Sequence, residues 1–330
     1  MRSTFGNAKD VKVVVEEGIT SLPHGFLSGN NSVTSIEISE SVKKIGSYAF
    51  DECSNLKSVI IKANIEEIKE RTFGRCRKLE KVELPDSVKS IGEYAFAECD
   101  KSDSIKIPEN IMHMGNGVFE RCLNLKNVVI PKKMTVIPDY TFIQCESLKN
   151  VVIPDNVETI GEHAFGSCKS LKKIMIPSGT KRIKDSAFGE CSNLEKIDIP
   201  DTVESVGIQA FVDCRKLKEI NFSKKLSVIE IGTFMGCDSL KSINIPAGVK
   251  TIKRYAFSEC FDLEQVNISN TVTYIGNCAF EDSYKLKNVS IPSSVTKIGD
   301  YAFGYCTSLA YVQSVSDYKT RTMASDKYKV

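Results

Sequence analysis

The sequence predicts a curved α/β solenoid, in which a parallel β-sheet lines a concave face and short helical or 3₁₀ turns form a convex face. Three observations predict this fold. A phenylalanine falls every 23 residues from Phe50 to Phe303, one short segment of each 23-residue repeat alternates apolar and polar residues, and a proline usually follows that segment. A repeat of this size cannot bury its apolar face alone, so neighbouring repeats are expected to stack into one continuous core.

The strand is the first element of each repeat. After a leading leucine, Ile174 points to one side of the chain while Lys173 and Met175 point to the other, and β-branched residues dominate the inner positions. A period of two with β-branched residues is typical of a strand. We count fourteen such segments, the first at residues 13–15 and the last near Val312.

A proline ends most strands, because it has no N–H to donate to a sheet and its ring fixes φ. Eight of the ten prolines take this position: Pro85, Pro108, Pro131, Pro154, Pro177, Pro200, Pro246 and Pro292. Beyond it the apolar residues come three and four apart, which favours short helical or 3₁₀ turns. A glycine column in these turns is expected to provide positive φ: Gly46, Gly92, Gly115, Gly161, Gly207, Gly276 and Gly299.

The repeat motif resembles that of a known family. The stretch IPDNVETIGEHAFGSCKSL, residues 153–171, is one instance of I-P-D-x-V-x-x-I-G-x-x-A-F-x-x-C-x-x-L. This motif is similar to the repeats of the BspA-like leucine-rich repeat proteins, a 23-residue class of bacterial and protozoan surface proteins, and the resemblance covers residues 13 to about 314. It implies a leucine-rich repeat solenoid, a secreted or surface location, recognition of host or microbial macromolecules, and no catalytic activity.

The expected domain organisation is one solenoid between two short ends. Residues 1–12 form a leader, residues 13–314 form a solenoid of about 13 repeats, and residues 315–330 form a polar tail that caps the last repeat weakly. We expect this tail to pack loosely and to leave an apolar surface near Phe303 and Leu309. Uncovered end strands favour weak self-association through the solenoid ends.

Charge and hydropathy exclude several classes of partner. The 44 basic and 42 acidic residues give a net charge of +2, too balanced to favour nucleic acid. The printed chain has no run of 18 apolar residues and no charged-then-apolar amino-terminal segment, so we expect neither membrane insertion nor an export signal within it. A secreted or cell-surface location therefore rests on the resemblance, and a cytoplasmic location is the alternative.

The twelve cysteines follow the repeat. Eleven lie three residues after a repeat phenylalanine, where a small, weakly polar side chain packs against the next repeat. Identically oriented neighbours suit a disulfide poorly, so we expect all twelve to be reduced, with Cys278, outside this column, the most reactive if it is exposed. Two serines depart from the repeat: Ser283 replaces a cysteine, and Ser102 replaces a leading leucine and is expected to loosen the core.

No motif for catalysis or for a cofactor occurs in the sequence. His24, His113 and His163 occupy three different columns of the repeat, and no spacing typical of zinc ligands is present. Nucleophile-elbow, Walker and dinucleotide-binding motifs are absent as well. We therefore expect no catalytic residues, no metal and no cofactor.

The candidate binding residues are the outward strand positions, because the repeat leaves these positions free to vary. Three consecutive apolar positions predict an exposed patch: Val129, Val152 and Met175. Three asparagines predict an amide ladder: Asn221, Asn244 and Asn267. Neighbouring polar positions complete the candidate site: Asn127, Asn150, Lys173 and Lys196. Ordinary β-propensity is the preferred explanation of the patch, and stabilisation of the sheet is the preferred role of the ladder.

A lysine-rich column beside these positions could bind an acidic glycan or protein, but acidic residues interrupt it and solvated edge charges are the preferred explanation. Its members are Lys57, Lys126, Lys149, Lys172, Lys218, Lys241 and Lys287. The leading hypothesis is a non-enzymatic recognition or adhesion module whose concave sheet binds a protein or glycan. The alternatives are an intracellular interaction scaffold and a targeting segment of a larger protein.

Overall fold

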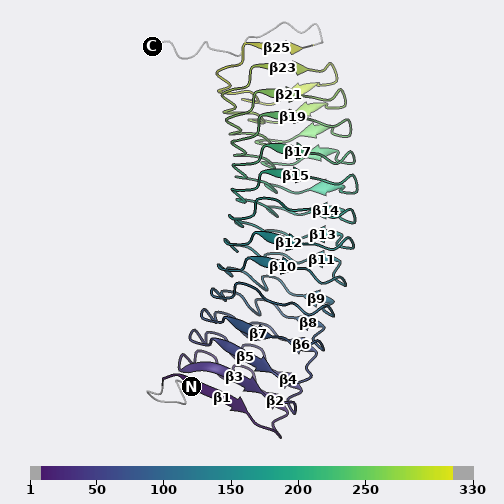
Figure 1. Cartoon of the computed structure of the whole chain (residues 1–330). Coiled ribbons are helices and arrows are strands. Elements are labelled where there is room, and N and C mark those ends of the chain that lie inside the picture. Colours follow the sequence, from purple (N-terminus) through teal and green to yellow (C-terminus); the bar gives the residue numbers. More distant parts are fainter. Residues whose placement is uncertain (1–8, 315–330) are drawn as a thin grey trace. The chain divides into compact units, whose positions relative to one another are not determined.

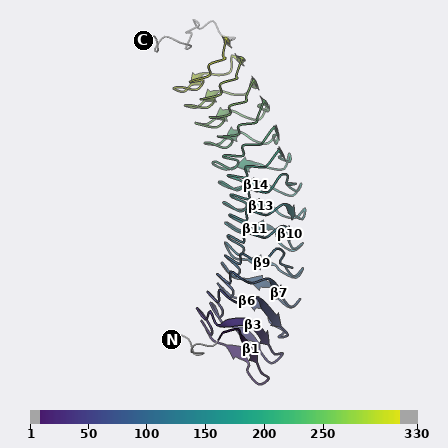
Figure 2. The same ribbon diagram turned by 60° about the vertical axis from the view of Figure 1, so that its left-hand side comes forward.

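The computed structural model describes residues 9–314. The chain divides into two compact units, Met1–Leu171 and Lys172–Val330, each built of stacked 23-residue repeats (Figure 1). In both units each repeat contributes, on one side, a strand of three to six residues or an isolated bridge in its place, and, on another side, a two-residue strand. We call these the long strands and the short strands. They form separate rows (Figure 2). The predicted leader falls largely, and the predicted tail wholly, outside the described residues. Continuity of one solenoid across the two units stays a prediction.

The long strands of the first unit are β1 (Val11–Val15), β3 (Val33–Ile38), β5 (Ser58–Ile61), β7 (Lys81–Glu83), β10 (Asn127–Val129) and β12 (Asn150–Val152). They pair in parallel in the orders β1-β3-β5-β7 and β10-β12. The short strands are β2 (Ser21–Leu22), β4 (Lys44–Ile45), β6 (Glu67–Ile68), β8 (Ser90–Ile91), β9 (His113–Met114), β11 (Val136–Ile137) and β13 (Thr159–Ile160).

The second unit repeats this arrangement. Its long strands are β15 (Lys196–Asp198), β17 (Glu219–Asn221), β19 (Ser242–Asn244), β21 (Gln265–Asn267), β23 (Asn288–Ile291) and β25 (Tyr311–Ser314), in the parallel orders β15-β17 and β19-β21-β23-β25. Its short strands are β14 (Arg182–Ile183), β16 (Ser205–Val206), β18 (Val228–Ile229), β20 (Thr251–Ile252), β22 (Tyr274–Ile275) and β24 (Lys297–Ile298).

The predicted strand positions are confirmed. Twelve of the fourteen are long strands, and the other two are isolated parallel bridges, Ser104 to Asn127 and Lys173 to Lys196. Ser102 is buried and its hydroxyl donates to the Leu79 carbonyl at 2.8 Å, so its polar group is satisfied inside the core. The strand is reduced to a bridge at Lys173 too, where the leading residue is a leucine, so the serine is not the sole cause of such an interruption.

The predicted helical or 3₁₀ turns are wrong, because residues 9–314 contain no helix. In a typical turn the Tyr48 and Phe50 amides donate to carbonyls of the next repeat at 2.9 and 3.0 Å, whereas the intervening Ala49 donates to Gly46 within its own turn. An α-helix uses every successive amide internally, which this alternation prevents. Tyr48 and Glu52, at φ of 59° and 60°, also leave the right-handed helical region.

The predicted role of the glycine column is also wrong. Positive φ is adopted instead by side-chain-bearing residues such as Tyr48, at positions two residues before and two after the repeat phenylalanine. The glycines are required by close approach: a Cβ on Gly92 would lie 2.5 Å from the Glu70 amide nitrogen, and one on Gly161 would lie 2.6 Å from that of Asp139. The preceding repeat therefore leaves no room for a side chain there.

The core is a ladder of identical side chains. Repeat phenylalanines stack with ring centroids 5.2 to 5.8 Å apart, as between Phe50 and Phe73 at 5.4 Å. Beside them the column cysteines are buried, and each printed thiol donates to a carbonyl 26 residues earlier, as Cys76 does to Phe50 at 3.2 Å. All twelve cysteines are free, as predicted, and Cys278 is half-buried. Near the end of the described range, Phe303 and Leu309 are half-buried.

Candidate binding surface

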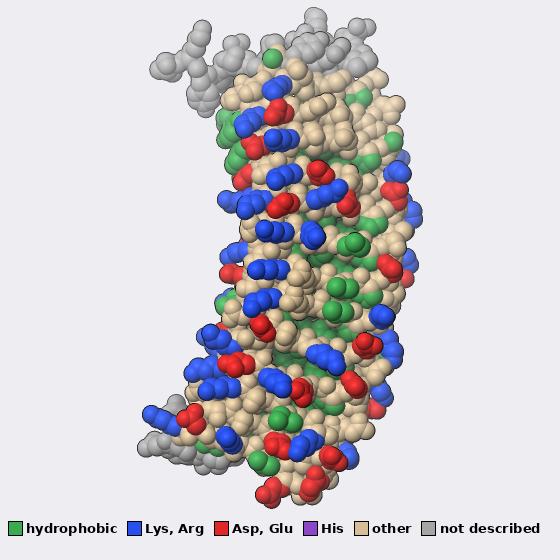
Figure 3. Space-filling model, viewed as in Figure 1, with side chains coloured by type: hydrophobic (Ala, Val, Ile, Leu, Met, Phe, Trp, Pro, Cys, Tyr) green, Lys and Arg blue, Asp and Glu red, His purple; other side chains and the backbone are tan. Residues whose placement is uncertain are grey.

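The strongest exposed apolar feature of the first unit lies on the face of its long strands. Val129 of β10 and Val152 of β12 are partners in register, and 64% and 58% of their respective surfaces are exposed. Both side chains point away from the core because successive side chains of a strand point to opposite faces. In β10, Val128 lies between the outward-facing Asn127 and Val129 and is buried. Figure 3 shows apolar side chains gathered on this face among charged ones.

The polar surroundings of this pair repeat with it. The segment LKNVVIP occurs at residues 125–131 and again at 148–154, so two consecutive repeats present the same lysine, asparagine and valine. The Asn150 side-chain amide donates to Asn127 Oδ1 at 2.7 Å. This bond uses one N–H of Asn150 and the side-chain oxygen of Asn127, so the NH₂ group of Asn127 takes no part in it. The two asparagines and two valines therefore form one surface across two repeats. We call Asn127, Val129, Asn150 and Val152 the Asn-Val surface.

The remaining predicted site residues lie in the second unit. Met175 is 82% exposed, and Lys173 bridges to Lys196 through the backbone. The Lys196 ammonium lies 3.2 Å from Glu219 and 3.5 Å from Asp198, and hydrogen bonding to Glu219 raises the pKa of Lys196. Because its charge is shared with two carboxylates, Lys196 is a weak candidate for binding an anionic ligand.

The predicted asparagine ladder is built in two pieces. Asn267 donates to Asn244, and these residues are in register on β21 and β19. Asn221 donates instead to the carboxylate of Asp198 on the preceding strand. Side-chain hydrogen bonds between neighbouring strands support the interpretation that these amides stabilise the sheet.

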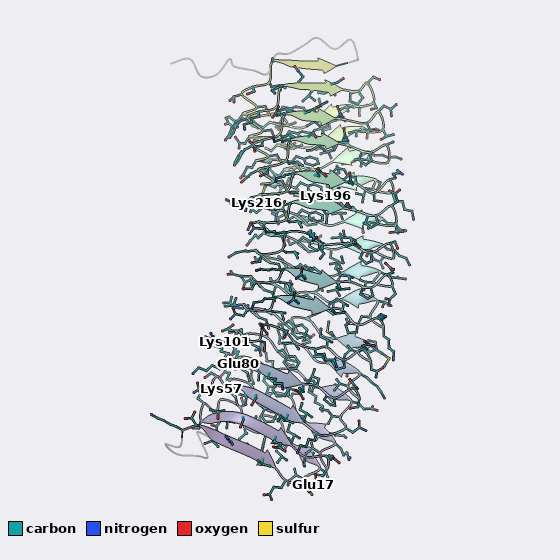
Figure 4. The ribbon with its side chains drawn as sticks, viewed as in Figure 1. Glu17, Lys57, Glu80, Lys101, Lys196 and Lys216 are labelled. Atoms are coloured by element: carbon teal, nitrogen blue, oxygen red, sulfur yellow. The ribbon has the colours of Figure 1, made fainter. Side chains whose placement is uncertain are left out.

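The lysine column is partly neutralised. Lys287 lies 2.6 Å from Glu264 and lowers the pKa of that carboxyl, and Lys126 lies 3.5 Å from Asp103. Lys57 and Glu80 lie along the same side of the first unit (Figure 4). Exposed ion pairs of this kind contribute little to stability, so these charges mainly keep the edge hydrated.

Sequence reasoning missed two exposed apolar residues in the column of Val129. Val14 of β1 is 61% exposed and Ile60 of β5 is 47% exposed. The strand alternation could have identified both. Glu37 lies between them in register, so they are isolated side chains rather than a patch.

Within the described range no group of three His, Cys, Asp or Glu residues could hold a metal ion. No helix in that part of the chain is long and apolar enough to span a bilayer. The candidate binding residues are exposed side chains at the strand positions of the repeats.

Comparison with known proteins identifies the repeat. The family profile described as "BspA type Leucine rich repeat region (6 copies)" matches residues 20–149, 135–260 and 227–322. A leucine-rich repeat protein from Bacteroides ovatus is 25% identical, with a TM-score of 0.68 and coverage of 93% of this chain and 92% of that one. A leucine-rich repeat protein from Eubacterium ventriosum is 23% identical, with a TM-score of 0.61 and coverage of 96% and 86%. No curated protein matches the chain.

Proposed function

The chain belongs to the BspA type leucine-rich repeat family, and from that membership we propose that it is a non-enzymatic recognition or adhesion module. Proteins of this repeat family are typically binding modules rather than enzymes. The partner is a protein or a glycan, and the face of the long strands is where it binds. Neither nucleic acid nor a membrane interior is a partner in this proposal. Weak self-association through the ends of the repeats stays a prediction.

The observation that carries the proposal is the exposed, in-register pair Val129 and Val152. Both are more than half exposed, and they stand beside an amide pair that holds unused hydrogen-bonding groups. Apolar anchors next to directional polar groups are the composition of a recognition patch. Elsewhere in the first unit the same column contains single apolar residues, Val14 and Ile60, each next to charged ones, Glu37, Glu83 and Lys106, so the strand does not require valine at two adjacent outward positions.

Location belongs to the same proposal: we place the protein outside the cell or at its surface, by family resemblance. The free cysteines favour the second candidate, a cytoplasmic scaffold, because reduced thiols are usual in a reducing compartment. Burial weakens that argument. It raises the pKa of Cys53 and Cys122 to about 12, so almost no thiolate is present at neutral pH and oxidation is slow. The thiol column is therefore compatible with an oxidising environment.

The test compares binding of wild type and Val129→Thr/Val152→Thr to arrayed glycans and to purified extracellular-matrix and microbial-surface proteins. Threonine keeps the β-branch and removes only the apolar anchor. Val14→Thr is the matched control, because Val14 is similarly exposed in the same column. We expect the double variant to lose binding and the control to keep it. Equal binding by the double variant, or no binding by wild type to any member, contradicts the proposal.

A further inference from the structure

A second exposed surface lies in the turns of the second unit, away from the strands. Phe261 and Tyr284 occupy the same position of consecutive repeats and stack with ring centroids 5.4 Å apart and planes 6° apart. Their exposed fractions are 36% and 43%, and Tyr305 nearby is 55% exposed. The repeat does not demand aromatics here, since the same position in the adjacent repeats is Asp238 on one side and Thr307 on the other.

Carboxylates surround this aromatic pair. Tyr284 hydrogen-bonds to Asp282, which raises the pKa of the phenol. Glu259 lies two residues before Phe261, and partial burial, then the charges of Asp213 and Asp282, raise the pKa of its carboxyl. Besides burial, the nearby carboxylates Asp213, Asp282, Asp238 and Glu281 all raise the pKa of Glu259, so several negative charges lie close together in this region.

Only some of these carboxylates have an ion-pair partner among the described residues. Among the described residues, the ion pairs of this region are Arg215 to Asp213 at 3.2 Å and Lys285 to Asp262 at 2.7 Å, and no lysine or arginine pairs with Asp238, Glu259 or Asp282. Desolvation together with the charges of Asp213 and Asp262 raises the pKa of Asp238 against the opposing effect of Arg215.

Glu259 and Asp282 lie two residues after a repeat phenylalanine. In the first unit an arginine in this same column pairs with the neighbouring acids. There Arg75 stands between two acids at the corresponding position, at 2.5 Å from Glu52 and 3.2 Å from Glu98. In the second unit Gly236, Glu259 and Asp282 occupy consecutive members of the column, with no cation among them. The uncompensated acids and the exposed rings therefore occur together, and neither is a requirement of the fold.

We propose that this aromatic-acidic surface, formed by Asp238, Glu259, Phe261, Asp282 and Tyr284, binds a polypeptide segment that carries arginine side chains. A planar guanidinium stacks on an aromatic ring and donates in pairs to carboxylates, which matches both halves of the surface. A lysine ammonium fits the charges but not the stacking. A neutral glycan could stack on the rings but would leave the mutual repulsion of the carboxylates unrelieved.

This surface lies on the turns and shares no residue with the Asn-Val surface. Its occupancy is therefore independent of the proposed function. Variants of Val129 and Val152 leave it intact, so failure of one proposal is distinguishable from failure of the other.

The test measures fluorescence anisotropy of a labelled Arg-Gly repeat peptide with the full chain at low salt. A Lys-Gly peptide of equal length and a neutral cello-oligosaccharide are the comparison probes. We expect the arginine peptide to bind about tenfold more tightly than the lysine peptide, and to weaken with added salt. Phe261→Ser/Tyr284→Ser should reduce its affinity about tenfold or more, because the stacking surface is lost.

Two further variants keep the test decisive. Glu259→Gln/Asp282→Asn preserves side-chain shape, so it tests the charges even if the aromatic variant unfolds, and it should weaken binding similarly. Leu123→Ser is the control, since Leu123 is 37% exposed at the same repeat position in the first unit and should change nothing. Unchanged peptide binding in both double variants overturns the proposal. Binding of the oligosaccharide in place of the peptide, lost in the aromatic variant, overturns it in favour of a glycan site.

Discussion

Replacing Ser283 with cysteine should stabilise the protein. Ser283 is fully buried in the cysteine column, and its hydroxyl has no hydrogen-bond partner, whereas the neighbouring Cys260 thiol donates to the Phe234 carbonyl at 3.4 Å. A thiol sulfur stands farther from Cβ than a hydroxyl oxygen does, so cysteine reaches the carbonyl of the previous repeat where serine falls short. Ser283→Cys therefore removes an unsatisfied buried polar group.

The expected gain in stability follows from the cost of burying the Ser283 hydroxyl without a hydrogen bond. An unsatisfied buried hydroxyl costs about 1–3 kcal/mol, and the thiol bond that replaces it is weak, so we expect a gain of about 1–2 kcal/mol. Urea unfolding under reducing conditions measures it, and hydrogen exchange of the amides around Phe280 shows whether the gain is local. Cys260→Ser is the mirror experiment and should cost a similar amount. A stability unchanged or lowered by Ser283→Cys, with Cys260→Ser neutral, would refute this account of the column.

Three further predictions test the core. Phe165→Ala should destabilise by about 3–5 kcal/mol, measured by the same unfolding assay, because it empties a fully buried position of the ring ladder. Gly161→Ala should cost about 1–3 kcal/mol because its Cβ would lie 2.6 Å from a backbone nitrogen, whereas Gly166→Ala, with a nearest contact of 3.4 Å, should cost less. Burial raises the pKa of the Cys53 thiol from 9.0 to about 12. Its contribution to the free energy of unfolding is therefore complete below pH 9 and is lost as the pH rises towards 12. Melting temperatures that stay constant between about pH 8 and 11 would contradict this prediction.

The strands and the cysteine column could be predicted from sequence because both depend on periodic burial. The alternation around Ile174 defines which residues face the core, and a column of eleven small side chains has one consistent environment. The turn conformation could not be predicted in the same way. Left-handed backbone is usually assigned to glycine, but here Tyr48 and Glu52 adopt it because hydrogen bonds to the next repeat fix the backbone on both sides.

For the candidate site, the exposure of strand residues could be predicted from sequence, but their hydrogen-bond partners could not. Exposure of Val129 and Val152 follows directly from strand alternation, and the structure places both outward. The partner of Asn221 did not follow, because an asparagine can donate to whichever neighbour offers an acceptor, and Asp198 is a stronger acceptor than Asn244. Phe261 was not singled out because residues in a turn have no simple period that separates inward from outward positions.

Both proposed surfaces arise where the repeat leaves a column unconstrained, and this gives a physical reason to separate their roles. Backbone amides of the turns alternate between their own repeat and the next one, so the backbone of the protein is largely satisfied internally and offers a ligand few donors. Both proposals therefore assign recognition to side chains. On the strands those side chains are spaced by the sheet and suit an extended partner that contacts successive repeats. In the turns, Phe261 and Tyr284 form a compact pair beside uncompensated acids, which suits a single cationic group. The two proposals together predict that an extended partner and a separate basic segment bind at the same time.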